Sequence, residues 1–242
     1  MSTRNSSNNF GVFTFSGPAY HQGIIPQNCN LNTLTYLAKN LYILDPVYGV
    51  LRGMDKMQPY RLEMGCKGIV GVEGTTTKGT LATYWKDSIT SCIGSQLLSI
   101  TTSANNRPIL VNLASEEYSS AVDIASLPRN TTFLNVVFRH KGRVVAVHAK
   151  RARGLMARYI AERGASSLLD ISKFNLEGYG CICVGESSGE KSGRWETKDV
   201  VGENVQIVNM MFDRDDVPVS EAKIKRKDDS AVVKSSSKKT RK

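Results

Sequence analysis

The sequence predicts a single α/β domain of the mixed α+β type, with a mixed sheet flanked by helices. Short apolar runs rich in β-branched and aromatic residues alternate along the chain with stretches of helical periodicity, a pattern typical of this class. Hydrophobic residues make up 40% of the 242 residues, enough to build a core. The chain shows no internal repeat.

The first predicted helix covers residues 31–44. Five leucines and an alanine recur there at helical spacing, and the helix should end before Asp45 because the proline that follows disfavours helical geometry in its predecessor. The next element is a short buried strand at residues 109–113. Ser115 then stands as the N-cap of a helix beginning near Glu116, so this segment predicts a strand-to-helix turn.

Two β-rich runs, at residues 133–138 and 144–149, surround a turn at 140–142 and predict a hairpin. A helix is predicted to follow directly, over residues 151–163. Gly164 ends it, because glycine readily adopts the left-handed conformation of a helix C-cap.

The last predicted strands lie at residues 178–184 and 205–211, with a Gly- and Ser-rich loop at 185–193 that we expect to be mobile. Both ends of the chain are polar and carry almost nothing to bury. The predicted organisation is a disordered leader (1–14), a folded domain (15–212) and a basic disordered tail (213–242).

The net charge of +10 is concentrated at one end of the chain. Residues 221–242 hold nine Lys or Arg and three acids, which leaves 23 bases and 19 acids elsewhere, a net charge of only +4. Any interaction of the folded part with nucleic acid must therefore depend on local clusters of Lys and Arg rather than on its overall charge. The tail could serve as a nuclear signal or a non-specific phosphate contact, and a merely solvated tail is the alternative.

Neither a membrane span nor a signal peptide is indicated, and five cysteines without framework spacing fit a reducing compartment. We expect a soluble cytoplasmic protein. Cys181 and Cys183 would share one face of a strand, but tetrahedral zinc needs four ligands. His21, His140 and His148 form no ligand pair. We therefore expect no metal site.

The strongest functional signal is a group of cations at the predicted junction of strand 144–149 and helix 151–163. Lys150, Arg151 and Arg153 would stand in the first turn, where the helix dipole makes each cation cost about 0.3 to 1 kcal/mol. A bound phosphate would remove that cost, and Arg158 lies on the same basic side. The alternative is a set of solvated cations paired with acids such as Glu162.

Three further polar clusters lie at predicted loops and strand ends, where α/β folds place ligand sites. Convergence on one cleft is therefore a second hypothesis. Each cluster could also be structural, with Ser115 as a cap, Arg61 paired with Glu63 or Asp55, and Tyr179 in the core. The clusters are Arg52, Asp55, Gln58, Tyr60, Arg61 and Glu63; Asn112, Ser115, Glu116, Glu117 and Tyr118; and Asn175, Glu177 and Tyr179.

Six motifs in one order resemble the YaaA family of peroxide-stress proteins. They are Tyr-Gly-Val-Leu-Arg at residues 48–52, Gln-Pro-Tyr-Arg-Leu-Glu-Met-Gly at 58–65, the 81–87 segment with Tyr84-Trp85, Val-Asn-Leu-Ala-Ser-Glu-Glu-Tyr at 111–118, Ala-Lys-Arg-Ala-Arg-Gly-Leu-Met at 149–156, and Phe-Asn-Leu-Glu-Gly-Tyr at 174–179. The resemblance covers residues 15–179 and fades towards 200. The family's N-terminal Ser-Pro-Ala-Lys-Thr strand and its helix-hairpin-helix element are not found, and Gly53 replaces a usual proline.

The resemblance implies a single α/β domain with a positively charged cleft, DNA binding, and a role in limiting oxidative DNA damage by lowering free iron under hydrogen peroxide. It implies no established cofactor. The residues it places along the cleft are Arg52, Tyr60, Arg61, Glu63, Asn112, Ser115, Lys150, Arg153, Glu177 and Tyr179.

Three hypotheses follow. The first is a stress protein that binds DNA or a nucleotide phosphate through Lys150, Arg151, Arg153 and Arg61. The second is an enzyme acting on a nucleotide or nucleobase, with Glu63, Glu117 or Glu177 as acid or base. The third is an incomplete and marginally stable fold. The sequence predicts neither the preferred DNA structure nor the oligomeric state.

Overall fold

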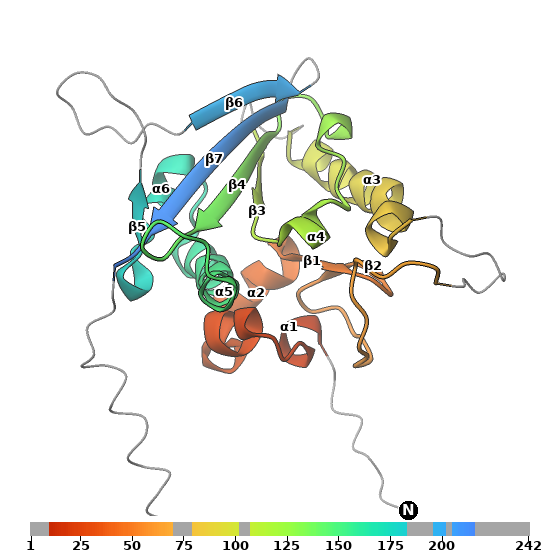
Figure 1. Ribbon diagram of the computed structural model, residues 1–242, viewed down its shortest axis with the longest axis horizontal. Helices are drawn as coiled ribbons and strands as arrows, with labels where there is room; N and C mark the ends of the chain where they lie inside the picture. Colours follow the sequence, from red (N-terminus) through yellow and green to blue (C-terminus); the bar gives the residue numbers. More distant parts are fainter. Residues whose placement is uncertain (1–9, 70–78, 102–106, 183–195, 202–204, 216–242) are drawn as a thin grey trace, which may run out of the picture.

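A computed structural model of the chain describes residues 10–69, 79–101, 107–182, 196–201 and 205–215. Its centre is a mixed sheet with the strand order β3-β4-β7-β5, in which β6 also pairs with β7. Strands β3, β4 and β7 run parallel, whereas β5 and β6 run antiparallel to β7 (Figure 1). The strands are β3 (Ile109–Asn112), β4 (Thr132–Phe138), β5 (Gly180–Ile182), β6 (Glu196–Val201) and β7 (Val205–Asp213).

Helices cover both faces of this sheet. Alternate residues of β4 point to opposite sides, so Leu134, Val136 and Phe138 pack in one core with α5 (Ala146–Arg163). Phe133 packs in a second core with α3 (Leu81–Thr101). The sheet therefore separates two hydrophobic cores, as expected of a sheet covered on both faces.

The N-terminal part of the chain packs outside α5 and forms a small hairpin. Helix α2 (Leu31–Asn40) begins at Asn30, whose side chain accepts a hydrogen bond from the Thr33 amide. Strands β1 (Tyr42–Asp45) and β2 (Gly49–Arg52) then pair antiparallel. The shorter elements are α1 (Gly11–Thr14), the π-helix η1 (Ala19–Ile24), η2 (Pro26–Asn28), α4 (Glu116–Ser119), η3 (Ile124–Ser126), α6 (Leu168–Ser172) and η4 (Leu176–Gly178).

Two glycines allow η1 to approach α5 at backbone contact. A methyl group on Gly154 would stand 1.8 Å from the carbonyl oxygen of Ala19, and one on Gly23 would stand 2.6 Å from Cα of Gly154. Side chains cannot occupy either position, so the glycines fix how the N-terminal segment docks on the domain.

The structure confirms several predicted elements. Strands β3, β4, β5 and β7 lie at the predicted runs 109–113, 133–138, 178–184 and 205–211, although β5 is shorter than predicted. Gly164 ends α5 with the left-handed φ of 60°. The predicted mobile loop at 185–193 and most of the leader and tail fall outside the described residues. None of the described helices is both long and apolar enough to cross a membrane.

Two predicted elements are wrong. Residues 144–149 do not form a strand of a hairpin, because α5 already begins at Ala146 and buries Ala149 and Ala152 against the sheet. The helix predicted over residues 31–44 stops at Asn40, and residues 42–45 form β1 instead. Leu41 and Leu44 continue the helical spacing, but residues 42–45 pair with β2 and bury alternate residues, Ile43 and Asp45, as a strand does.

Candidate functional site

The cations of α5 do not stand where the sequence pattern placed them. Because α5 begins at Ala146, its first turn contains no Lys or Arg, and Lys150 comes one full turn later. The helix-dipole penalty falls off within the first turn, so it does not act on Lys150, Arg151 or Arg153. The prediction that these cations oppose the fold is therefore wrong, and their function must be judged from their contacts.

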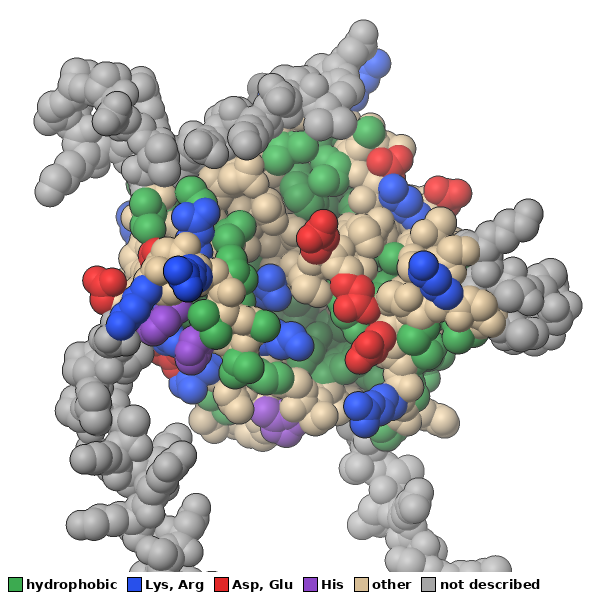
Figure 2. Space-filling view, in the orientation of Figure 1, with side chains coloured by type: hydrophobic (Ala, Val, Ile, Leu, Met, Phe, Trp, Pro, Cys, Tyr) green, Lys and Arg blue, Asp and Glu red, His purple; other side chains and the backbone are tan. Residues whose placement is uncertain are grey.

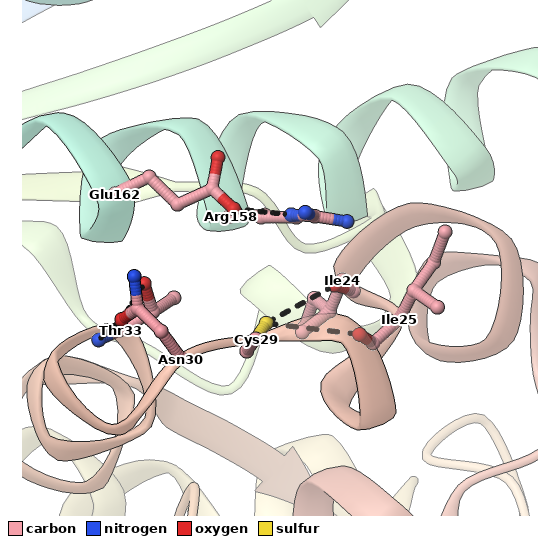
Figure 3. Close-up of polar contacts among 7 residues, drawn as sticks. All are labelled: Ile24, Ile25, Cys29, Asn30, Thr33, Arg158 and Glu162. Atoms are coloured by element: carbon pink, nitrogen blue, oxygen red, sulfur yellow. Dashed lines mark hydrogen bonds and ion pairs between the residues drawn. The ribbon is translucent and has the colours of Figure 1, made fainter.

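Two of the α5 arginines are paired with carboxylates. Arg151 forms an ion pair with Glu177. Arg158 donates from Nε to Oε1 of Glu162 over 2.6 Å, and Figure 3 shows this pair on the part of α5 near Cys29. Neutralisation by a neighbouring acid lowers the ability of both side chains to attract a phosphate.

Lys150 and Arg153 remain available in the first half of α5, and Arg163 remains available at its C-terminal end. Lys150 and Arg153 are three residues apart and therefore neighbours on the helix surface. Neither forms an ion pair with a residue that the structure describes. Arg153 is half-buried, its Nε is buried without a hydrogen-bond partner among the described residues, and burial lowers the pKa of its guanidinium. A charged donor in this state gains free energy from an anionic partner.

A buried carboxylate organises the loop after β1. Asp45 is fully buried and its Oδ1 accepts hydrogen bonds of 2.8 Å from the backbone N of Val47 and of Tyr48. Its Oδ2 accepts the hydroxyl of Tyr60. Burial, and then this hydrogen bond and charge, raise the pKa of Tyr60. Asp45 was not among the predicted site residues, although an aspartate just before Pro46 is a turn signal that could have found it.

The loop at residues 58–65 is held against α4. Glu117 accepts a 2.8 Å hydrogen bond from the Gly65 amide. Burial and the charges of Glu117, Glu63 and Asp45 raise the pKa of Tyr118. The loop therefore contacts α4 through Gly65 and Glu117 and contacts the end of β1 through Tyr60 and Asp45, and the convergence of these residues on one ligand cleft stays a prediction. Glu117 is occupied in positioning the loop, whereas Glu63 is exposed.

Three asparagines form a ladder across the parallel strands. Asn112 of β3 donates to Oδ1 of Asn135 in β4 over 3.0 Å, and Asn135 donates to Oδ1 of Asn209 in β7 over 3.1 Å. Asn112 also accepts from the Ala114 amide at the end of its strand. The ladder fixes Asn112 and the start of the turn into α4. Sequence reasoning missed Asn135 and Asn209 because the contacts join residues far apart in the chain.

The Glu177 and Tyr179 cluster lies at the other end of α5 from Glu162 and is mainly structural. Tyr179 is buried in the core, as its alternative interpretation predicts, and Arg214 lies 4.7 Å from the centre of its ring. Arg214 is itself buried and contacts Oε2 of Glu177 at 3.4 Å. Asn175 is exposed at the start of η4 and makes no side-chain cap.

The remaining predicted residues are dispersed. Arg52 in β2 donates to the carbonyl of Lys39 over 2.9 Å and lies over the ring of Tyr42, so it serves the hairpin. Arg61 is exposed and makes no ion pair with a described residue. Ser115 occupies the N-cap position of α4 but its side chain makes no cap hydrogen bond.

The face seen in Figure 2 is hollowed near its centre, and both kinds of charge border the hollow. Lys and Arg side chains gather on the side of α5, and Asp and Glu side chains gather on the side of α4. No group of three or more His, Cys, Asp or Glu residues that could hold a metal ion occurs in the described part of the chain.

Comparison with known proteins identifies relatives over most of the folded part. The sequence profile described as peroxide stress protein YaaA matches residues 2–182. A UPF0246 protein of Francisella tularensis subsp. novicida (strain U112) is 38% identical over 179 residues, which is 72% of this chain and 65% of the relative. A UPF0246 protein of Francisella philomiragia (strain ATCC 25017) is 39% identical over 172 residues, 69% of this chain and 62% of the relative.

The chain thus spans a little under two thirds of the length of these relatives. The profile match covers more than half of the chain and includes all six motifs that resemble the family. The chain belongs to the peroxide stress protein YaaA family.

Proposed function

We propose that the protein acts in the response to peroxide by binding DNA, or another phosphate-bearing ligand, through Lys150 and Arg153. The observation that carries the proposal is the half-buried Arg153 guanidinium, whose Nε has no partner among the described residues, with Lys150 one helical turn away. Phosphate oxygens satisfy such donors with charge-assisted hydrogen bonds.

The surroundings of this pair support the same proposal. Arg151 and Arg158 are neutralised by Glu177 and Glu162, so Lys150 and Arg153 carry the unpaired positive charge of the first half of α5, and Arg163 stands apart at its C-terminal end. The acidic side chains on the α4 side of the hollow in Figure 2 would repel a second phosphate. In this arrangement one stretch of a nucleic-acid backbone would lie along α5, with its bases towards the α4 side.

The experiment is a titration of a fluorescently labelled 20-base-pair duplex, followed by anisotropy. The double variant Lys150→Ala with Arg153→Ala should weaken binding by about tenfold or more, because each lost phosphate contact removes a counterion-release contribution. The matched control is Arg158→Ala with Lys173→Ala. It removes the same charge from side chains that are paired with Glu162 and Asp170. Equal losses in both variants would contradict the assignment.

A further inference from the structure

Strand β3 forms one edge of the sheet, because among the described strands it pairs with β4 alone. The Thr132 amide of β4 donates to the carbonyl of Pro108 over 2.8 Å. In a parallel pair of strands, alternate residues direct both of their backbone groups at the same neighbour. Pro108 and Leu110 therefore direct their backbone groups at β4, whereas those of Ile109 and Val111 point away from it.

The outward side of Ile109 and Val111 is an open edge. Neither residue exchanges a backbone hydrogen bond on that side with any residue in the described parts of the chain. All four residues of β3 are half-buried, whereas β4 beside it is mostly buried. No charged residue interrupts the chain between Arg107 and Glu116. An unpaired apolar strand of this kind is a template for the addition of another strand.

Opposite charges stand at the two ends of the open edge. Arg107, just before β3, is exposed and donates to Oε1 of Gln206 over 2.8 Å, an uncharged partner. Glu116 begins α4 just after β3 (Figure 1), is exposed, and forms no ion pair with a residue that the structure describes. An antiparallel strand meets each of these charges with its opposite if it carries the same order of charges as β3. A second copy of β3 has this order.

We propose that the open edge binds a second copy of the chain, with β3 against β3 in an antiparallel pair about a two-fold axis. With the axis at Leu110, Ile109 of each copy faces Val111 of the other, and each facing pair exchanges both N–H···O bonds. Arg107 of each copy then lies beside the segment that leads from the other copy's β3 into α4, where Glu116 stands. A strand of four residues contributes few contacts, so the dimer forms reversibly with concentration.

Sedimentation equilibrium of the nuclease-treated full chain tests the association. The mean mass of wild type should rise from 26.6 kDa towards twice that value between about 5 and 500 μM. Arg107→Glu should weaken dimerisation by about tenfold or more, because it sets like charges against each other, and Arg107→Glu with Glu116→Arg should restore it. The control Lys173→Glu makes the same charge change at the end of α6, near β5 at the other edge of the sheet (Figure 1), and should leave dimerisation unchanged.

Disulfide trapping tests the register of the two strands. Leu110 faces its own counterpart across the axis, where the paired Cα atoms lie about 4.5 Å apart, a distance that a disulfide spans. Val111 lies diagonally from its counterpart at about 7 to 8 Å, which is too far. Under mild oxidation, Leu110→Cys should therefore form a covalent dimer that wild type and Val111→Cys do not form. The five native cysteines are common to all three proteins.

The proposal is overturned if wild type keeps the mass of one chain at every concentration. It is also overturned if nuclease treatment abolishes the association, since DNA would then bridge the copies. A charge reversal at Arg107 that behaves like Lys173→Glu, or one that Glu116→Arg does not rescue, would exclude the paired charges. Crosslinking of Val111→Cys without crosslinking of Leu110→Cys would refute the antiparallel register.

Discussion

Gly154 of α5 lies in backbone contact with Ala19 of η1, so closely that an added methyl group would stand 1.8 Å from the Ala19 carbonyl oxygen. This contact joins the N-terminal segment to the helix that carries Lys150 and Arg153. It gives a structural reason for the glycine in the Ala-Arg-Gly-Leu-Met portion of the α5 motif.

The variant Gly154→Ala should destabilise the protein by about 2 to 4 kcal/mol, because relief of a clash with backbone requires η1 to move. Urea unfolding measures this change. Gly17→Ala is the matched control near the same element, since nothing lies within 4 Å of a methyl group there. A loss of less than about 0.5 kcal/mol in Gly154→Ala would show that η1 is not docked as described.

Asp45 is expected to be a stability residue. Asp45→Asn should lower the free energy of unfolding by about 2 to 4 kcal/mol, because a carboxylate that accepts two backbone amides and the Tyr60 hydroxyl cannot be matched by an amide. Tyr60→Phe should lower the free energy of unfolding by less, since the Val47 and Tyr48 amides still donate to Asp45. A double-mutant cycle between the two positions should show coupling, and additive effects would exclude their contact.

Stability should also decrease at alkaline pH. Burial and Asp45 raise the pKa of Tyr60 above its unfolded value near 10, so the folded state keeps a proton that the unfolded state loses. The stabilisation that the protonated Tyr60 hydroxyl gives the folded state is complete below pH 10 and declines as the pH rises above 10. Between pH 10 and 11, the free energy of unfolding, measured by chemical denaturation, should therefore fall less steeply in Tyr60→Phe than in wild type. Parallel curves for the two proteins would be inconsistent with the raised pKa.

The buried Arg214 depends on Glu177. Glu177→Gln should cost about 1 to 3 kcal/mol, because it leaves the buried guanidinium without its carboxylate partner. Glu162→Gln removes a more exposed carboxylate from its pair with Arg158 and should cost less than about 1 kcal/mol. Thermal unfolding of the two variants at equal pH measures the difference, and the reverse order would refute this role of Glu177.

The sheet could be predicted from the sequence because its strands are short, apolar and bounded by turns. Runs 133–138 and 205–211 are too short and too rich in β-branched residues for helices, and they form β4 and β7. The same rule failed at 144–149, where three valines have strand propensity. Burial of Ala149 and Ala152 against the sheet outweighs that propensity and starts α5 early, which leaves two of the valines largely exposed.

The candidate site could be predicted only in part. Local motifs located Tyr60, Glu117 and Tyr118, because they lie in polar turns at strand ends. The pairing of Arg151 with Glu177 and the asparagine ladder depend on contacts between distant segments, which periodicity does not report. The choice of Lys150 and Arg153 from the α5 cations therefore required the structure.

The most direct test of the phosphate-binding claim is the salt dependence of DNA affinity. Between about 50 and 200 mM salt, the logarithm of the affinity of wild type should fall linearly with the logarithm of the salt concentration. The slope should be smaller by about 2 in Lys150→Ala with Arg153→Ala, because two phosphate contacts are lost. An unchanged slope in that variant would contradict the account.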